Sequence, residues 1–100
     1  MRRVIKLSPQ AGRDIDQHLS AVAGQKLEDG MRLLDQFEHD LLHLAAVHGT
    51  GRRLETKNSS LGDVRSWAVM GFEPYILFYR PTREGIEVIR VLQRDRDGEE

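Results

Sequence analysis

The chain has 100 residues, of which 39% are hydrophobic and 31% are charged, and its net charge is −1 at pH 7. This size and composition predict one globular domain, residues 1–100, and exclude a disordered or fibrous protein. The chain contains no cysteine, which excludes disulfides and thiolate metal sites, and no run reaches the roughly 20 apolar residues that span a bilayer. We therefore expect a cytoplasmic protein that makes no membrane contact.

The first quarter of the chain predicts a strand followed by a helix. Residues 4–7 are a short apolar run, and Ser8 is a suitable cap for a helix whose first position is Pro9. The helical spacing is carried by Ala11, Ile15, Leu19 and Val22, and Gly24 ends it. Asp14 and Asp16 are expected to face solvent near the positive end of this helix.

A second, longer helix is predicted from Gln25 to Val47. Its apolar stripe consists of Leu27, Met31, Leu34, Phe37, Leu41, Leu44 and Ala45, widened by Leu33 and Leu42. His39 and His43 are four residues apart, a spacing that can place two imidazoles on one helical face. No third ligand accompanies them, so we interpret this pair as part of a solvated face and predict no metal site.

The second half of the chain predicts strands over residues 64–70, 75–80 and 86–92, with a weak strand near residues 52–55. Turns are expected at 71–74 and 81–85, and strands joined by such short connections must be antiparallel. The run 75–80 is apolar on both faces, as in a central strand buried on both sides. The predicted fold class is α+β, in the order β-α-α-β-β-β, with a helical hairpin packed on one face of a small antiparallel sheet.

Arginine residues are concentrated among these strands: Arg65, Arg80, Arg83, Arg90, Arg94 and Arg96. One interpretation is cross-strand ion pairing, for example of Arg65 or Arg90 with Glu87. The other is that the sheet face left open by the helices binds an anion, a nucleic acid or an acidic protein. Trp67, Tyr75 and Tyr79 are candidate anchors there, and the two tyrosines share one face of their strand.

No motif in the sequence indicates a catalytic or cofactor site. The chain contains no nucleophile elbow, no P-loop and no dinucleotide-binding fingerprint. We therefore predict no catalytic residue and no cofactor.

Several short motifs, in this order, resemble the ParE/RelE superfamily of bacterial toxins from type II toxin–antitoxin systems. They are Leu7-Ser8-Pro9-x-Ala11 with Asp14-Ile15 at the strand-to-helix junction, Leu44-Ala45 before Gly49 or Gly51, Val64-Arg65-Ser66 with Val69, the strand from Tyr75 to Arg80, and Ile89 to Leu92 followed by Arg96-Asp97. Each motif is short, but their order and spacing extend over nearly the whole chain.

The resemblance leaves two activities to choose between. RelE-type members are ribosome-dependent mRNA endoribonucleases, and RNA cleavage needs groups that move protons and stabilise charge on the phosphate. Here Gln93 stands where many relatives carry histidine, and neither tyrosine nor histidine follows Tyr79. The ribonuclease is therefore kept as the alternative.

Resemblance to the ParE branch implies a toxin that inhibits DNA gyrase by protein binding, without enzymatic activity of its own. It also implies a hetero-oligomer with a cognate, ParD-like antitoxin. The antitoxin binds operator DNA, and we expect no direct sequence-specific DNA binding by the toxin itself. On this reading we assign target binding to Arg90, Arg94 and Arg96. Antitoxin binding is assigned to Arg65, Trp67, Tyr75, Tyr79 and Arg80. A third possibility is an inert member of the fold that retains only partner binding.

Overall fold

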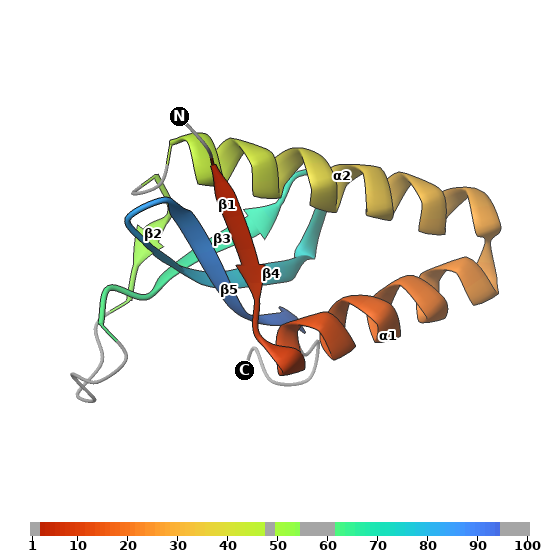
Figure 1. Ribbon diagram of the computed structural model, residues 1–100. Coiled ribbons are helices and arrows are strands. Elements are labelled where there is room, and N and C mark those ends of the chain that lie inside the picture. The colour runs from red at the N-terminus through yellow and green to blue at the C-terminus, as the bar shows by residue number, and fades with distance from the viewer. Residues whose placement is uncertain (1–2, 48–49, 55–61, 95–100) are drawn as a thin grey trace.

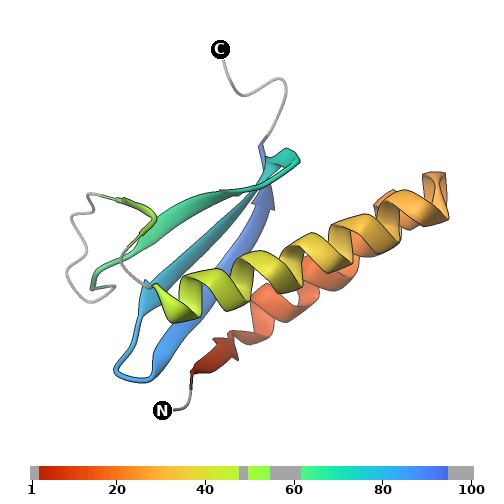
Figure 2. The same cartoon turned by 90° about the horizontal axis from the view of Figure 1, so that it is seen from above.

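The structure, a computed structural model, describes residues 3–47, 50–54 and 62–94. Its elements are β1 (Val4–Leu7), α1 (Pro9–Gln25), α2 (Leu27–Ala46), β2 (Arg52–Arg53), β3 (Arg65–Val69), β4 (Phe72–Pro81) and β5 (Gly85–Gln93). The two helices form a hairpin that covers one face of the sheet (Figures 1 and 2). The predicted α+β class, with a helical hairpin on one sheet face, is confirmed.

The sheet has five strands in the order β1-β5-β4-β3-β2. Strands β2, β3, β4 and β5 pair antiparallel with one another, as predicted. The first strand differs, because β1 pairs parallel with β5, with Val4 opposite Gly85 and Leu7 opposite Val88. The prediction of a purely antiparallel sheet is therefore wrong at this edge. In the sequence, both helices of the hairpin separate β1 from the other strands. A connection of that length permits parallel pairing.

The turn between β3 and β4 is shorter than predicted. Val69 is opposite Phe72, so only Met70 and Gly71 connect the two strands, and β4 begins at Phe72 instead of Tyr75. Gly71 has a φ of +81°, a conformation that glycine adopts without steric cost and that tight hairpins require.

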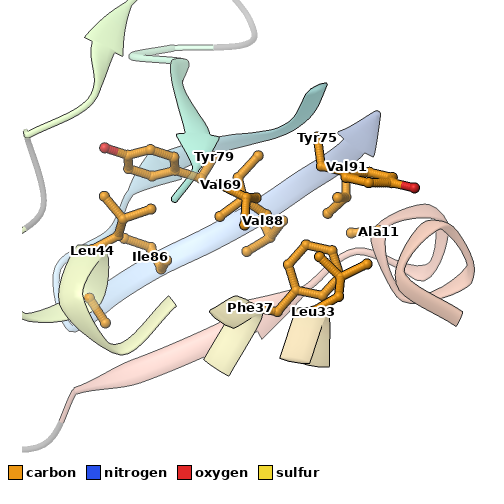
Figure 3. Packing of buried hydrophobic residues seen from close by; sticks show 12 residues of the cluster. Ala11, Leu33, Phe37, Leu44, Val69, Tyr75, Tyr79, Ile86, Val88 and Val91 are labelled. Atoms are coloured by element: carbon orange, nitrogen blue, oxygen red, sulfur yellow. The ribbon is translucent and has the colours of Figure 1, made fainter. Parts of the chain in front are cut away.

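The main hydrophobic core lies between the helical hairpin and the sheet (Figure 3). Leu33, Phe37 and Leu44 of α2 are at most 1% exposed. They belong to one buried cluster with the sheet residues Val69, Tyr75, Leu77, Tyr79, Ile86, Val88 and Val91. Tyr75 and Tyr79 do share a face of β4, as predicted, and that face is the one the helices cover.

The buried face of α2 differs from the predicted stripe. Its N-terminal half is buried at Gly30 and Leu33, whereas Leu27 and Met31 are 66% and 60% exposed. The reason is the close approach of the two helices at Gly30, where a Cβ atom would lie 2.6 Å from Ala23 Cβ. A glycine therefore marks the packing face, and a pattern that follows only the apolar residues misses it.

Neither helix of the described residues is long and apolar enough to cross a membrane.

Candidate binding face of the sheet

The sheet face opposite the helices, which we call the open face, carries a mixture of arginine and apolar side chains. Because successive side chains of a strand point to opposite faces, the residues that alternate with the buried ones lie on this face. Its cross-strand rows pair Ser66 with Phe78 and Arg90, Ala68 with Ile76 and Leu92, and Arg80 with Glu87. The prediction that β4 is central is confirmed, but burial on both faces is wrong, because Ile76 and Phe78 are only half-buried.

The open face is hollowed beside β2. The hollow has a volume of about 480 Å³ and is lined by Arg52, Arg53, Leu54, Ser66, Ile76, Phe78 and Arg94. Leu54, Ile76 and Phe78 supply apolar surface, and three arginines supply forked donors. We call this site the arginine hollow. Apolar surface beside guanidinium groups suits a segment that presents both apolar and carboxylate side chains.

Two of the three arginines in the hollow are available for a ligand. Arg53 Nε lies 3.3 Å from Asp63 Oδ1. Within residues 3–47, 50–54 and 62–94, the side chains of Arg52 and Arg94 make no hydrogen bond or ion pair, and both are exposed. The backbone N–H of Arg94 donates to the carbonyl of Pro74 over 2.6 Å, which fixes the chain where this arginine leaves the sheet.

Tyr79 and Arg65 hold the chain segment that leads into the hollow. Tyr79 is fully buried, and its hydroxyl accepts a hydrogen bond of 2.8 Å from the backbone N–H of Gly51. Burial raises the pKa of the Tyr79 hydroxyl above its usual value of 10. Arg65 donates to the Gly51 carbonyl over 3.2 Å and to Asp63 Oδ2 over 3.0 and 3.2 Å. These contacts position Gly51, and therefore the neighbouring Arg52.

Arg90 is engaged by α1. Its Nε and one terminal nitrogen donate to the two carboxylate oxygens of Asp14 over 2.8 and 3.2 Å. Asp14 is only 8% exposed, so the prediction that it faces solvent is wrong. The hydrogen bond from Arg90 is the main reason that the pKa of Asp14 lies below its usual value of 3.8.

Asp14 belongs to a group of α1 side chains that pair with the free edge of β5. Strand β1 ends at Leu7, opposite Val88, so beyond Val88 the edge of β5 that faces away from β4 is paired with no strand of the described residues. Ser8 Oγ donates to the carbonyl of Ile89 over 2.7 Å, and Asp14 accepts from the Val91 N–H over 2.9 Å. His18 Nε2 lies 2.7 Å from the Val91 carbonyl. Side chains thus supply the hydrogen bonds that a further strand would make.

Arg80 makes the cross-strand ion pair that the sequence led us to expect of Arg65 or Arg90. Its guanidinium lies 2.7 Å from Glu87 Oε1, because the two residues are directly opposite in the register of β4 and β5. The pairing interpretation is therefore correct for Glu87 but wrong about its partner.

The three aromatic residues predicted as anchors on the open face lie on the opposite side of the sheet. Trp67 Nε1 donates to Asp40 Oδ2 over 3.1 Å, and Tyr75 packs its ring against His18. Tyr79 belongs to the buried cluster between the sheet and the helices (Figure 3). The apolar side chains of the open face are instead Ile76, Phe78 and Leu92. Because β4 is apolar at both odd and even positions, the sequence does not tell which set the helices cover.

Two further predictions concern Arg96 and the histidine pair of α2. Arg96 lies outside the described residues. His43 packs its ring 5.6 Å from that of Trp67. In the ranges that the structure describes, no three histidine or acidic side chains gather in a group able to hold a metal ion.

Comparison with known proteins agrees with the order of the elements. The profile of the family described as "ParE toxin of type II toxin-antitoxin system, parDE" matches residues 5–98. A solved structure titled "Chromosomal ParDE TA system from P. aeruginosa" is similar with a TM-score of 0.71 and 18% identity, over 91% of this chain and 95% of that chain. At this identity the similarity concerns the fold. Among curated proteins, none gives a significant sequence match.

Proposed function

Because the chain belongs to the ParE toxin family of type II toxin–antitoxin systems, we propose that it inhibits DNA gyrase by binding to it, and that a cognate antitoxin neutralises it. The observation that carries the binding mode is the arginine hollow, in which Arg52 and Arg94 stand beside an apolar floor. Such a surface suits an acidic, partly apolar protein segment, since charge-assisted bonds give orientation and apolar contact gives affinity.

The proposed roles of the arginines follow from what each one already contacts. Arg65, Arg80 and Arg90 make ion pairs within the chain, so we assign them to supporting the sheet and the segment beside the hollow. Arg52 and Arg94 are assigned direct contact with the antitoxin segment. We also assign gyrase binding to Arg94 and Arg96. For Arg96 this role stays a prediction from the sequence.

A binding role is favoured over the ribonuclease alternative by the position of the proton-transferring groups. Tyr75 and Tyr79 are the only tyrosines of the chain, and both face the helices. Gln93, at the end of β5, has an amide side chain, which cannot act as a general acid or base at neutral pH. RNA cleavage needs an acid and a base near the phosphate, and the arginines of the hollow supply neither.

Expression of the chain in bacteria, with and without a candidate ParD-like antitoxin, tests the neutralisation. We expect growth to stop with the toxin alone and to resume with both proteins. The affinity of the purified pair should fall at least about tenfold in Arg52→Ala/Arg94→Ala. The matched control is Arg83→Ala, an exposed arginine of the β4–β5 turn. Equal affinity of the double variant, or equal loss in the control, would remove the hollow from the antitoxin site.

A further inference from the structure

A second hollow of the molecule has no part in the proposed function. It lies between the second half of α1 and the ends of β4 and β5, and its volume is about 480 Å³. We call it the glutamine hollow. Its lining comes from α1 (Ala21, Val22 and Gln25), from the first half of β4 (Pro74 and Tyr75) and from the end of β5 (Gln93). A volume of this order is typical of sites that hold a small organic molecule.

The glutamine hollow differs from the arginine hollow in its charge. Among the described residues that line it, none is acidic or basic, whereas three arginines line the other hollow. Moving a charged group from water into a neutral, partly apolar site is costly, because nothing there compensates for the lost hydration. We therefore expect an uncharged ligand, and neither a carboxylate nor a phosphate.

Three polar side chains of the glutamine hollow lack a partner. Tyr75 is only 8% exposed, yet its hydroxyl makes no hydrogen bond within the described ranges. Figure 3 shows this hydroxyl pointing away from the buried cluster. The carboxamides of Gln25 and Gln93 are exposed, and they too make no hydrogen bond with any residue that the structure describes. A ligand that supplies a hydrogen bond to the buried tyrosine is therefore favoured.

The walls of the glutamine hollow are fixed by contacts with neighbouring residues. The ring of His18 packs edge-on against that of Tyr75, with ring centroids 4.9 Å apart, and His18 Nε2 lies 2.7 Å from the Val91 carbonyl. On the sheet side, the Arg94 N–H donates to the Pro74 carbonyl over 2.6 Å. The hollow is therefore formed before a ligand arrives, which lowers the entropic cost of binding.

We propose that the glutamine hollow binds a purine base of the adenine type, which is uncharged, planar and edged with both donors and acceptors. A glutamine carboxamide pairs through two hydrogen bonds with the N6 amine and N7 of adenine. Val22 and Pro74 supply apolar surface for the ring, and the Tyr75 hydroxyl is a donor for a further ring nitrogen. The base belongs either to a free nucleoside or to an unpaired strand of nucleic acid. The proposal does not rest on the proposed function.

Adenosine is the probe, and its affinity for the full chain is measured by NMR titration of the backbone amide signals. We expect the affinity to fall at least about tenfold in Gln25→Leu/Gln93→Leu and at least about threefold in Tyr75→Phe. The matched control, Gln10→Leu/Gln17→Leu, changes two exposed glutamines of α1 that do not line the hollow, and it should leave the affinity unchanged. Because the exchanged glutamines are exposed and Tyr75→Phe keeps its ring, thermal melting of each variant should match that of the parent.

Purine riboside, which lacks the N6 amine, gives a second readout. It should bind the parent chain at least about threefold more weakly than adenosine does. This difference should vanish in Gln25→Leu/Gln93→Leu, because the carboxamides recognise the amine. A single-stranded oligodeoxyadenylate separates the two sources of the base. Binding tighter than that of adenosine, with the same dependence on the glutamines, identifies a strand, whereas weaker binding identifies the free nucleoside.

Two kinds of result would overturn the proposal. One is the absence of a saturable shift with adenosine, or an equal loss of affinity in Gln10→Leu/Gln17→Leu. The other is binding that survives in Gln25→Leu/Gln93→Leu but is lost in Arg52→Ala/Arg94→Ala, since the ligand would then occupy the arginine hollow. These titrations contain neither gyrase nor antitoxin, so failure of the proposed function leaves their outcome unchanged.

Discussion

Asp14 and Arg90 lie 76 positions apart in the chain, yet hydrogen bonds of 2.8 and 3.2 Å join their side chains. The same Asp14 carboxylate accepts from the Val91 backbone. Asp14 therefore joins α1 to β5. Its ion pair also directs the Arg90 side chain from the open face towards the edge of the sheet. Arg90, which the family resemblance assigns to target binding, is thus also the ion-pair partner of a residue in α1.

The first prediction concerns the pH dependence of stability. Arg90 holds the pKa of Asp14 below its usual value of 3.8, so the native carboxylate stays ionised at a pH where the unfolded one is protonated. The stabilisation is fully present above the unfolded pKa of about 3.9 and is lost as the pH falls through the lower, native pKa. We expect the wild type to exceed Asp14→Asn in unfolding free energy by a constant amount at neutral pH, and this difference to shrink on acidification. Urea titrations at several pH values measure it; a difference independent of pH would contradict the assignment.

The second prediction concerns the hydroxyl of Tyr79. Tyr79→Phe leaves the Gly51 N–H without its acceptor, which is expected to cost about 1–3 kcal/mol in unfolding free energy at pH 7. Tyr75→Phe is the matched control, because the Tyr75 hydroxyl has no hydrogen-bond partner in the described part of the chain. Chemical denaturation compares the two variants.

Tyr79→Phe also tests the pKa of Tyr79. Since burial raises this pKa above 10, the unfolded chain loses the proton first, and the native state loses stability as the pH rises past that value. Tyr79→Phe should show a smaller alkaline loss of stability than the wild type. Identical alkaline profiles for the two proteins would argue against a buried, protonated Tyr79.

The third prediction concerns the helix contact at Gly30. Gly30→Ala would place a Cβ atom 2.6 Å from Ala23 Cβ, and such overpacking costs about 1–3 kcal/mol. This loss exceeds the gain of up to about 1 kcal/mol in helix propensity. At Gly24 a Cβ atom would meet nothing within 4 Å, so Gly24→Ala should be neutral or stabilising. Thermal melting of the two variants tests this, and a more stable Gly30→Ala would disprove the close contact.

The fourth prediction concerns Arg96, which lies outside the described residues. We expect Arg96→Ala to reduce growth inhibition while its affinity for the antitoxin stays within about tenfold of the wild type, or about 1.4 kcal/mol. Growth curves and a binding titration give the two numbers. Parallel loss of both would show that Arg96 is structural or shared by the two partners.

Local signals predicted the elements of this fold well. Ser8 accepts from the Ala11 N–H and begins α1 as its position before Pro9 indicates. The short turns of the second half correctly predicted the antiparallel pairing of β3 with β4 and of β4 with β5. Such features depend on neighbours a few residues away, which the sequence displays directly.

The binding face was harder to predict because it depends on contacts between distant residues. Nothing near Asp14 indicates that Arg90 is its partner, and nothing in β4 indicates whether Tyr79 or Phe78 faces the helices. Arg52 lies in a strand of two residues, and its place in the hollow depends on Tyr79 and Arg65 holding Gly51. The number of arginines pointed to a binding face, but three of the strand arginines, Arg65, Arg80 and Arg90, are engaged within the chain.

The most direct test of the proposed toxin function is a supercoiling assay with purified gyrase and relaxed plasmid DNA. We predict that the chain lowers the yield of supercoiled plasmid, that cleaved DNA accumulates, and that prior addition of the antitoxin restores supercoiling. Undiminished supercoiling and no cleaved DNA, at toxin concentrations that stop growth, would contradict gyrase as the target.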